Sequence, residues 1–314
     1  MTAPPLAPWA DQLSCYTAAL GSWLAIRRPD WWRPLLAGGP VLRVTPVPGD
    51  LLRFDHHTRP PAPTLGLRLR TAADWNTARH LIADEASRQR AVIVAGDTFR
   101  LPWQRTYGTA HAPHWFLLRP DVGGRWTVED PLRMMTTSGR QEPVLVEVEE
   151  RDLAGICRAL PAGNPVAELR EQAALGVTDV RLGSAYRWLT YDADGTSEVP
   201  QTPVAGSDAG AALRLLARMF REHGAQATAY RQADDLWQAS RQRELAARML
   251  GGRWTGIAEI WRRLPPLLLH GRLAAEHTAG LRAPGHLADV LEQLAQAEAT
   301  TEPDIRGGVV HALT

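Results

Sequence analysis

Hydrophobic and polar positions follow different patterns in the two halves of the chain. Up to about residue 150, apolar stretches are short and alternate with segments rich in Pro and Gly, as is typical of strands and loops. Two segments in this half, at about 15–28 and 71–90, have helical spacing instead. From residue 151 onward helical spacing dominates, and it predicts helices within 151–160, 165–175, 208–224, 227–250, 254–279 and 286–299.

These patterns predict an α+β fold in two parts. We expect a first domain at 1–150, in which a helix packs on an antiparallel sheet, and a mainly helical domain at 151–314. The segment 180–200 has a mixed pattern and is able to extend the sheet of the first domain.

The clearest local structure is a β-hairpin in the first domain. The strand HWFLLRP begins at His114, DVGG predicts a turn, and RWTVEDP returns to Asp130 and Pro131. Antiparallel pairing then places residue 114 beside residues 130–131, and cross-strand neighbours have Cβ atoms about 4.5–5.5 Å apart. We therefore expect the side chains of His114 and Asp130 to meet.

Composition excludes several classes of function. The chain has 314 residues, 45% apolar content and a net charge of +1, so neither nucleic-acid binding nor attraction to acidic membranes is expected. The first residues lack the pattern of a secretory signal, and no apolar run is long enough to span a bilayer. Two cysteines do not make a disulfide framework, which favours a reducing cytoplasm.

Bound cofactors and metals are not expected either. His56 and His57 follow Asp55, but no further ligand stands at metal-binding spacing from them. No Gly-rich loop follows a predicted strand, which argues against a nucleotide site.

All 35 basic residues are arginine, because the sequence contains no lysine. A GC-rich genome is the simpler explanation, and the many Ala, Gly and Pro residues agree with it. The alternative hypothesis is that lysine amines are avoided because they would capture a reactive acyl group.

Cys15 is the candidate nucleophile. It lies at the predicted start of the first helix, with Asp11 or Ser14 as N-cap, and helix N–H groups and the helix dipole favour a thiolate at such a position. Cys157 lies among apolar neighbours in a predicted helix, so we expect it to be buried and inert.

A thiolate needs a proton-transfer partner, and His114 held by Asp130 is the leading candidate. Together with Cys15 they match the nucleophile, base and orienting group of Cys and Ser hydrolases. His111 is a rival base on the preceding loop, but it has no obvious paired carboxylate in the sequence.

Residues 10–135 resemble the butirosin biosynthesis protein H family. The shared pattern is a helix-start Cys, a strand ending at Asp97, the pair Leu101–Pro102, a strand opening with His114–Trp115, and a strand ending with Asp130–Pro131. Residues 205–300 resemble the helical region of that family more loosely.

The resemblance implies a papain-like fold, related to that of bacteriocin-processing cysteine peptidases. It also implies an acyltransferase that makes an amide from a thioester, in the biosynthesis of antibiotics or other specialised metabolites. The donor would be an acyl group on the phosphopantetheine of an acyl carrier protein, and the acceptor a small-molecule amine. Cys15 would carry the acyl group and His114 would act as base and acid.

The chain departs from the papain-like pattern at the oxyanion hole. The expected Gln lies six residues before the nucleophile, where this sequence has Trp9. Gln12 is the nearest candidate, as an oxyanion donor together with the Cys15 N–H or as a surface residue. Asp97 is either a helper of the site or a cap at the end of its strand.

The same acyl-enzyme chemistry would also serve a cyclase or a thioesterase, which cyclises or releases the acyl group. Two other functions use the same residues. A cysteine peptidase needs the same triad and a groove for extended peptide. A non-catalytic binding protein that retains the fold would explain the altered oxyanion position. The rate of alkylation of Cys15 separates this last reading from the catalytic ones.

Overall fold

The computed structural model describes residues 10–36, 40–55, 65–120, 125–136, 139–160, 163–175, 185–192, 209–224, 233–277 and 285–299. The chain divides into two compact units, one formed by residues 1–39 and 58–199 and the other by residues 40–57 and 200–314. This division differs from the expected boundary at residue 150, because α4, α5 and β10 belong to the first unit. It also assigns an early β-hairpin, β1–β2, to the second unit.

The first unit is built on a six-stranded antiparallel sheet with the order β3-β10-β4-β5-β6-β9. The mixed α+β class with an antiparallel sheet is therefore confirmed. The strands are β3 (Leu67–Ala72), β10 (Tyr186–Tyr191), β4 (Val92–Asp97), β5 (Pro113–Pro120), β6 (Arg125–Asp130) and β9 (Val144–Glu149). A separate small hairpin consists of β7 (Met134–Thr136) and β8 (Gly139–Gln141).

The segment 180–200 contributes a strand to the interior of this sheet. Its part at Tyr186–Tyr191 forms β10, which pairs with β3 on one side and with β4 on the other. The first four residues of β10 are all buried, as is typical of an interior strand covered on both faces, and Trp188 is almost completely buried.

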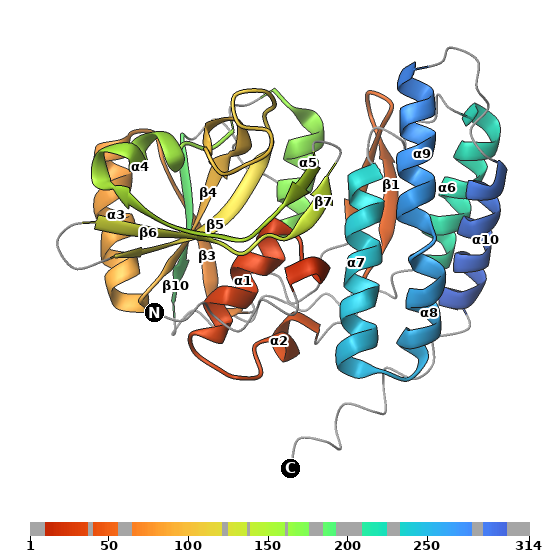
Figure 1. Cartoon of the computed structure of the whole chain (residues 1–314), viewed down its shortest axis with the longest axis horizontal. Coiled ribbons are helices and arrows are strands. Elements are labelled where there is room, and N and C mark those ends of the chain that lie inside the picture. Colours follow the sequence, from red (N-terminus) through yellow and green to blue (C-terminus); the bar gives the residue numbers. More distant parts are fainter. Residues whose placement is uncertain are drawn as a thin grey trace. The chain divides into compact units, whose positions relative to one another are not determined.

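Helices cover both faces of the sheet (Figure 1). The helices of this unit are α1 (Cys15–Ala25), α2 (Trp32–Leu36), α3 (Trp75–Gln89), α4 (Glu150–Ile156) and α5 (Pro165–Leu175), with 3-10 turns η1 (Ala10–Gln12) and η3 (Thr98–Arg100). Successive residues of a strand point to opposite faces. In β5, Trp115 contacts Tyr16 of α1, whereas Phe116 belongs to the core beneath α3 and α4.

The two predicted helices of the first half both have side-chain N-caps, and Ser14 rather than Asp11 is the cap of the first. Ser14 caps α1 in a reciprocal capping box with Thr17, and Asp74 caps α3 through the Thr77 N–H. The helix α1 ends at Ala25 rather than at Arg28, because the next backbone N–H groups form a turn on Leu24 before Pro29.

The central strand β4 is buried along its whole length. Gly96 is required there because an added Cβ would lie 2.8 Å from the carbonyl oxygen of Ile156 and 2.9 Å from the ring of Phe116. The end of α4 therefore packs directly on the backbone of β4, next to the strand end that carries the candidate site.

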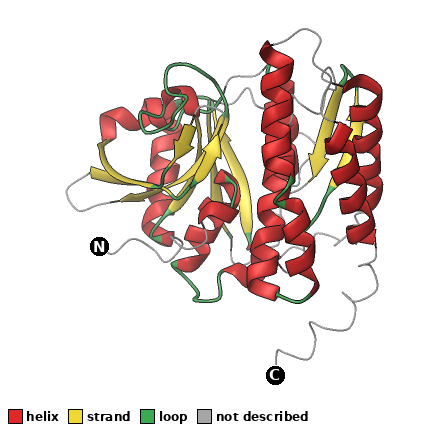
Figure 2. Cartoon of the chain, turned by 45° about the vertical axis from the view of Figure 1, so that its right-hand side comes forward, coloured by secondary structure: helices red, strands yellow, loops and turns green. Residues whose placement is uncertain are grey.

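The second unit contains five helices among its described residues, together with the hairpin β1 (Arg43–Val47) and β2 (Leu51–Asp55). The helices are α6 (Ala209–His223), α7 (Ala233–Leu250), α8 (Arg253–Trp261), α9 (Leu264–His277) and α10 (Gly285–Ala299). The α6 helix packs along α10, and the hairpin lies beside the helices and contacts α6 (Figure 2).

The segment predicted as one helix at 254–279 forms two, α8 and α9. Pro265 and Pro266 are the reason, because proline lacks an N–H group and is tolerated in the first turn of a helix but not in its interior. Among the helices that the structure describes, none is long and apolar enough to cross a membrane.

Candidate active site

Cys15 is the first residue of α1, as expected, and its side chain is partly exposed. The capping box of Ser14 and Thr17 uses the N–H groups of those two residues. The N–H of Cys15 lies in the first turn, where backbone N–H groups have no partner within the helix. The start of α1 therefore offers a thiol and a backbone donor at the same residue.

His114 and Asp130 are in contact, which confirms the expected pairing of their side chains. The distance between His114 Nε2 and Asp130 Oδ2 is 2.8 Å, and both side chains are almost completely buried. The ladder between β5 and β6 ends at Leu117 and Glu129, so the two residues are not the cross-strand neighbours that the sequence predicted. They lie beyond its last pair and are joined by their side chains alone.

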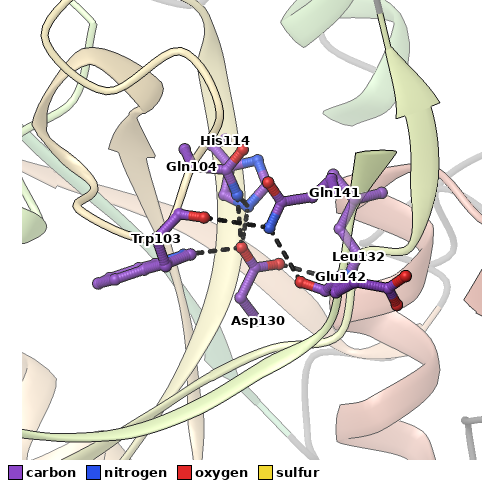
Figure 3. A network of polar contacts seen from close by, with 7 residues as sticks. All are labelled: Trp103, Gln104, His114, Asp130, Leu132, Gln141 and Glu142. Atoms are coloured by element: carbon purple, nitrogen blue, oxygen red, sulfur yellow. Dashed lines mark hydrogen bonds and ion pairs between the residues drawn. The ribbon is translucent and has the colours of Figure 1, made fainter. Parts of the chain in front are cut away.

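Asp130 accepts hydrogen bonds from four groups (Figure 3). Trp103 Nε1 lies 2.8 Å and Gln104 Nε2 2.6 Å from Oδ2, the same oxygen that His114 contacts. The Leu132 N–H donates to the other oxygen, Oδ1, at 3.1 Å. The Asp130 carboxyl group is therefore surrounded by N–H groups of three side chains and one backbone position.

Sequence reasoning did not predict that Trp103 and Gln104 contact Asp130. They follow Leu101–Pro102 in the long loop between β4 and β5, where no periodic pattern marks a role. Two adjacent side chains with N–H donors, eleven and ten residues before His114, indicate a role at the site only once the loop is known to fold back on Asp130.

The surroundings of His114 favour its charged form. Burial by itself lowers the pKa of His114, but the charge and hydrogen bond of Asp130 outweigh burial. A hydrogen bond and charge interaction with Cys15 add to the effect, and the pKa is raised to about 10. His114 Nε2 faces Asp130, so Nδ1 is the ring nitrogen that remains for the thiol. His114 therefore interacts with Cys15 on one side of its ring and with Asp130 on the other.

Gln12 lies in η1, three residues before Cys15, and only 9% of it is exposed. The reading of Gln12 as a surface residue is therefore wrong. Its Oε1 is buried and has no hydrogen-bond partner within the described part of the chain. Buried amide groups normally have hydrogen-bond partners, so this end of Gln12, close in sequence to Cys15, stands out.

Cys157 is buried and lies at the C-terminal cap of α4. Burial raises the pKa of its thiol, which keeps it protonated and unreactive at neutral pH. The expectation that Cys157 is buried is confirmed, although it ends its helix rather than lying in the middle.

The structure corrects the interpretation of His111. Its Nδ1 lies 2.6 Å from Oδ2 of Asp97, so it does have a paired carboxylate. Its side chain is 46% exposed and its ring stacks on Phe99, while Asp97 is fully buried. Asp97 also caps η3 by accepting the Phe99 N–H, as one of the two interpretations of Asp97 predicted. It has a second role as the partner of His111.

Within the ranges that the structure describes, no three His, Cys, Asp or Glu side chains are grouped as a metal site. The pair His56 and His57 lies outside the described residues. No protein-family model matches the chain, and comparison with curated proteins found no match.

Proposed function

We propose that this protein is a cysteine-dependent acyltransferase that makes an amide from a thioester through an acyl-enzyme on Cys15. The observation that carries the proposal is that buried His114 interacts both with Cys15, at a helix start, and with Asp130. A helix-start cysteine beside an antiparallel sheet that supplies a His and an Asp is also the arrangement of a papain-like enzyme. We therefore propose a papain-like fold for the first unit.

The first half-reaction forms the acyl-enzyme. With the pKa of His114 raised to about 10, the ring is protonated at neutral pH. The proposed attacking group is the thiolate of Cys15, paired with this charged ring. The thiolate attacks the carbonyl carbon of the donor thioester. As the intermediate collapses, the bond between that carbon and the donor sulfur breaks, and His114 Nδ1 gives its proton to the departing thiolate.

The second half-reaction forms the amide. The acceptor amine attacks the acyl-Cys15 carbonyl carbon and loses a proton to the now neutral His114. The carbon–sulfur bond to Cys15 breaks, and the thiolate and the charged ring are restored. Asp130 orients the ring through its contact with Nε2.

Both intermediates carry a negative oxygen that needs donors. The N–H of Cys15 is one donor, and the buried amide of Gln12 is the proposed second. Amide N and O atoms are assigned from their contacts, and among the residues that the structure describes the oxygen end of Gln12 has no partner. Flipping the Gln12 amide exchanges its oxygen and nitrogen atoms, and the NH2 group then occupies the position of the oxygen.

The donor proposed for the site is an acyl group on the phosphopantetheine arm of an acyl carrier protein, and the proposed acceptor is a small-molecule amine. A thioester suits a cysteine nucleophile because the exchange of one thiolate for another is nearly balanced in energy. Amines attack the resulting acyl-Cys faster than water does when the site binds and orients them.

Acyl transfer is tested with acyl-pantetheine and acyl-loaded carrier protein as donors. We expect intact-mass spectrometry to detect an acyl adduct, and peptide mapping to place it on Cys15. The Cys157→Ala variant is the matched control, because it removes the only other cysteine and should keep the adduct. Full turnover by Cys15→Ala would contradict the proposal, and peptide cleavage without thioester turnover would point to a peptidase.

A further inference from the structure

The 15 residues between β4 and β5, residues 98–112, form a closed loop. At its base, Asp97 pairs with His111, and Thr98 donates its N–H to the carbonyl of Ala112 at 3.0 Å. Leu101 anchors the loop in the core, where it is completely buried. Long connections of this kind are uncommon in compact domains unless they serve a site.

The part of the loop that faces the site is held on two sides. The ring of Trp103 packs edge-on against Phe116 of β5, with centroids 5.9 Å apart. The Gln141 side chain, in β8, donates to the Trp103 carbonyl at 3.4 Å and to the Glu142 carbonyl at 2.9 Å. Figure 3 shows Trp103, Gln141 and Glu142 around Asp130.

The distances around Asp130 fix which groups carry protons. Gln104 Nε2 lies 2.6 Å from Asp130 Oδ2, and the reverse amide orientation would place two acceptors without a proton at that distance. The Gln104 nitrogen also lies 3.1 Å from His114 Nε2. Since the amide nitrogen only donates, and His114 Nε2 donates to Asp130, these two nitrogens share Oδ2 as a common acceptor and do not bond to each other.

Three N–H donors therefore converge on a single oxygen, from Trp103, Gln104 and His114. Protonation of that oxygen would replace an acceptor by a donor and break at least one of these bonds. A proton leaving His114 Nε2 would face the same obstacle, because Oδ2 has no room for it. The proton on Nδ1 is free of this constraint.

We propose that Gln104 and Trp103 are positioning residues that hold the Asp130 carboxyl group as a hydrogen-bond acceptor and keep the Nε2 proton on His114. The proton that moves during acyl transfer is then the one on Nδ1, which faces Cys15. This inference rests on the proposed function for its catalytic consequence, whereas the location of the proton on the ring is a property of the resting protein.

Gln104→Met and Trp103→Phe test the inference. Methionine keeps the length of the side chain without the N–H, and phenylalanine keeps the packing on Phe116 without the indole donor. Hydrogen bonds to charged groups correspond to roughly tenfold to hundredfold effects, so we expect kcat for acyl transfer to fall by that range with KM within about twofold. Gln89→Met, which removes an amide on α3 that contacts Arg27, is the control and should leave kcat unchanged.

A second measurement needs no substrate. We expect the wild-type protein to give a downfield NMR signal for the His114 Nε2–H at neutral pH, protected from exchange with water. The signal should broaden or disappear in Gln104→Met and Trp103→Phe, and should persist in Gln89→Met. A merely structural role would lower the melting temperature of the variants but leave this signal intact.

The outcomes separate the two proposals. An unchanged Nε2–H signal and unchanged kcat in folded Gln104→Met and Trp103→Phe would overturn the positioning role. Full activity of Cys15→Ala would overturn the proposed function, and the NMR measurement would still decide the positioning role. If Gln104→Met does not fold, Trp103→Phe carries the test, because it removes a single N–H group and retains an aromatic ring.

Discussion

Replacing Asp130 by asparagine isolates the charge that holds His114 in its protonated state. The side chain keeps its size and can still accept a hydrogen bond from the ring, but the negative charge is lost. Burial, which is the largest influence on the ring and lowers the pKa of His114, then acts without compensation from Asp130. We expect the pKa of His114 to fall from about 10 to below its ordinary value of 6.5.

The two pKa values of His114, about 10 in the folded protein and 6.5 ordinarily, give the expected effect on the free energy of unfolding. The difference between about 10 and 6.5 corresponds to roughly 5 kcal/mol in favour of the charged ring in the folded protein. Because the folded-state pKa is the higher one, this stability is fully present below about pH 6.5. It is lost as the pH rises through about 10. In Asp130→Asn this contribution is absent, so the two proteins should differ by several kcal/mol more at pH 6 than at pH 11.

NMR titration of the His114 ring gives the pKa, and urea unfolding followed by tryptophan fluorescence at several pH values gives the stability difference. Subtracting the free energy of unfolding of one protein from that of the other cancels the contributions of groups that titrate alike in both. A wild-type His114 that titrates near pH 6.5, or a stability difference that is constant from pH 6 to pH 11, would refute the reasoning.

Three further predictions concern other parts of the first unit. Iodoacetamide should modify Cys15 in the native protein and Cys157 only after unfolding, as read by peptide mass spectrometry; equal rates would contradict the assignment. Gly96→Ala should destabilise by about 1–3 kcal/mol in thermal unfolding, because the added Cβ meets fixed atoms. Gly155→Ala, where nothing lies within 4 Å of the added atom, is its control and should not destabilise. Ser14→Ala should cost about 1 kcal/mol by removing the cap of α1, and an unchanged urea midpoint would exclude that role.

The elements with strong local signals were predictable. Ser14 and Pro29 bracket α1, alternation and a turn signal mark β5 and β6, and apolar periodicity marks the later helices. These signals act between residues a few positions apart, so they are visible in the sequence. The position of Cys15 and the meeting of His114 with Asp130 followed from them.

The boundary between the units was not predictable from composition. The early hairpin β1–β2 belongs with helices that begin more than 150 residues later, and β10 joins a sheet whose other strands precede residue 150. Both placements depend on burying apolar faces against distant elements, and a change of local periodicity does not reveal such partners.

The sequence by itself determined that Cys15 begins a helix and that His114 and Asp130 lie on two neighbouring strands. Only the tertiary structure decided how these groups are held: Trp103 and Gln104 reach Asp130 across 27 and 26 residues, and His111 pairs with Asp97 across 14. The physical reason is that a hydrogen bond between side chains of a loop depends on the path of the whole loop. That path is fixed by packing in the core, and no local propensity encodes it.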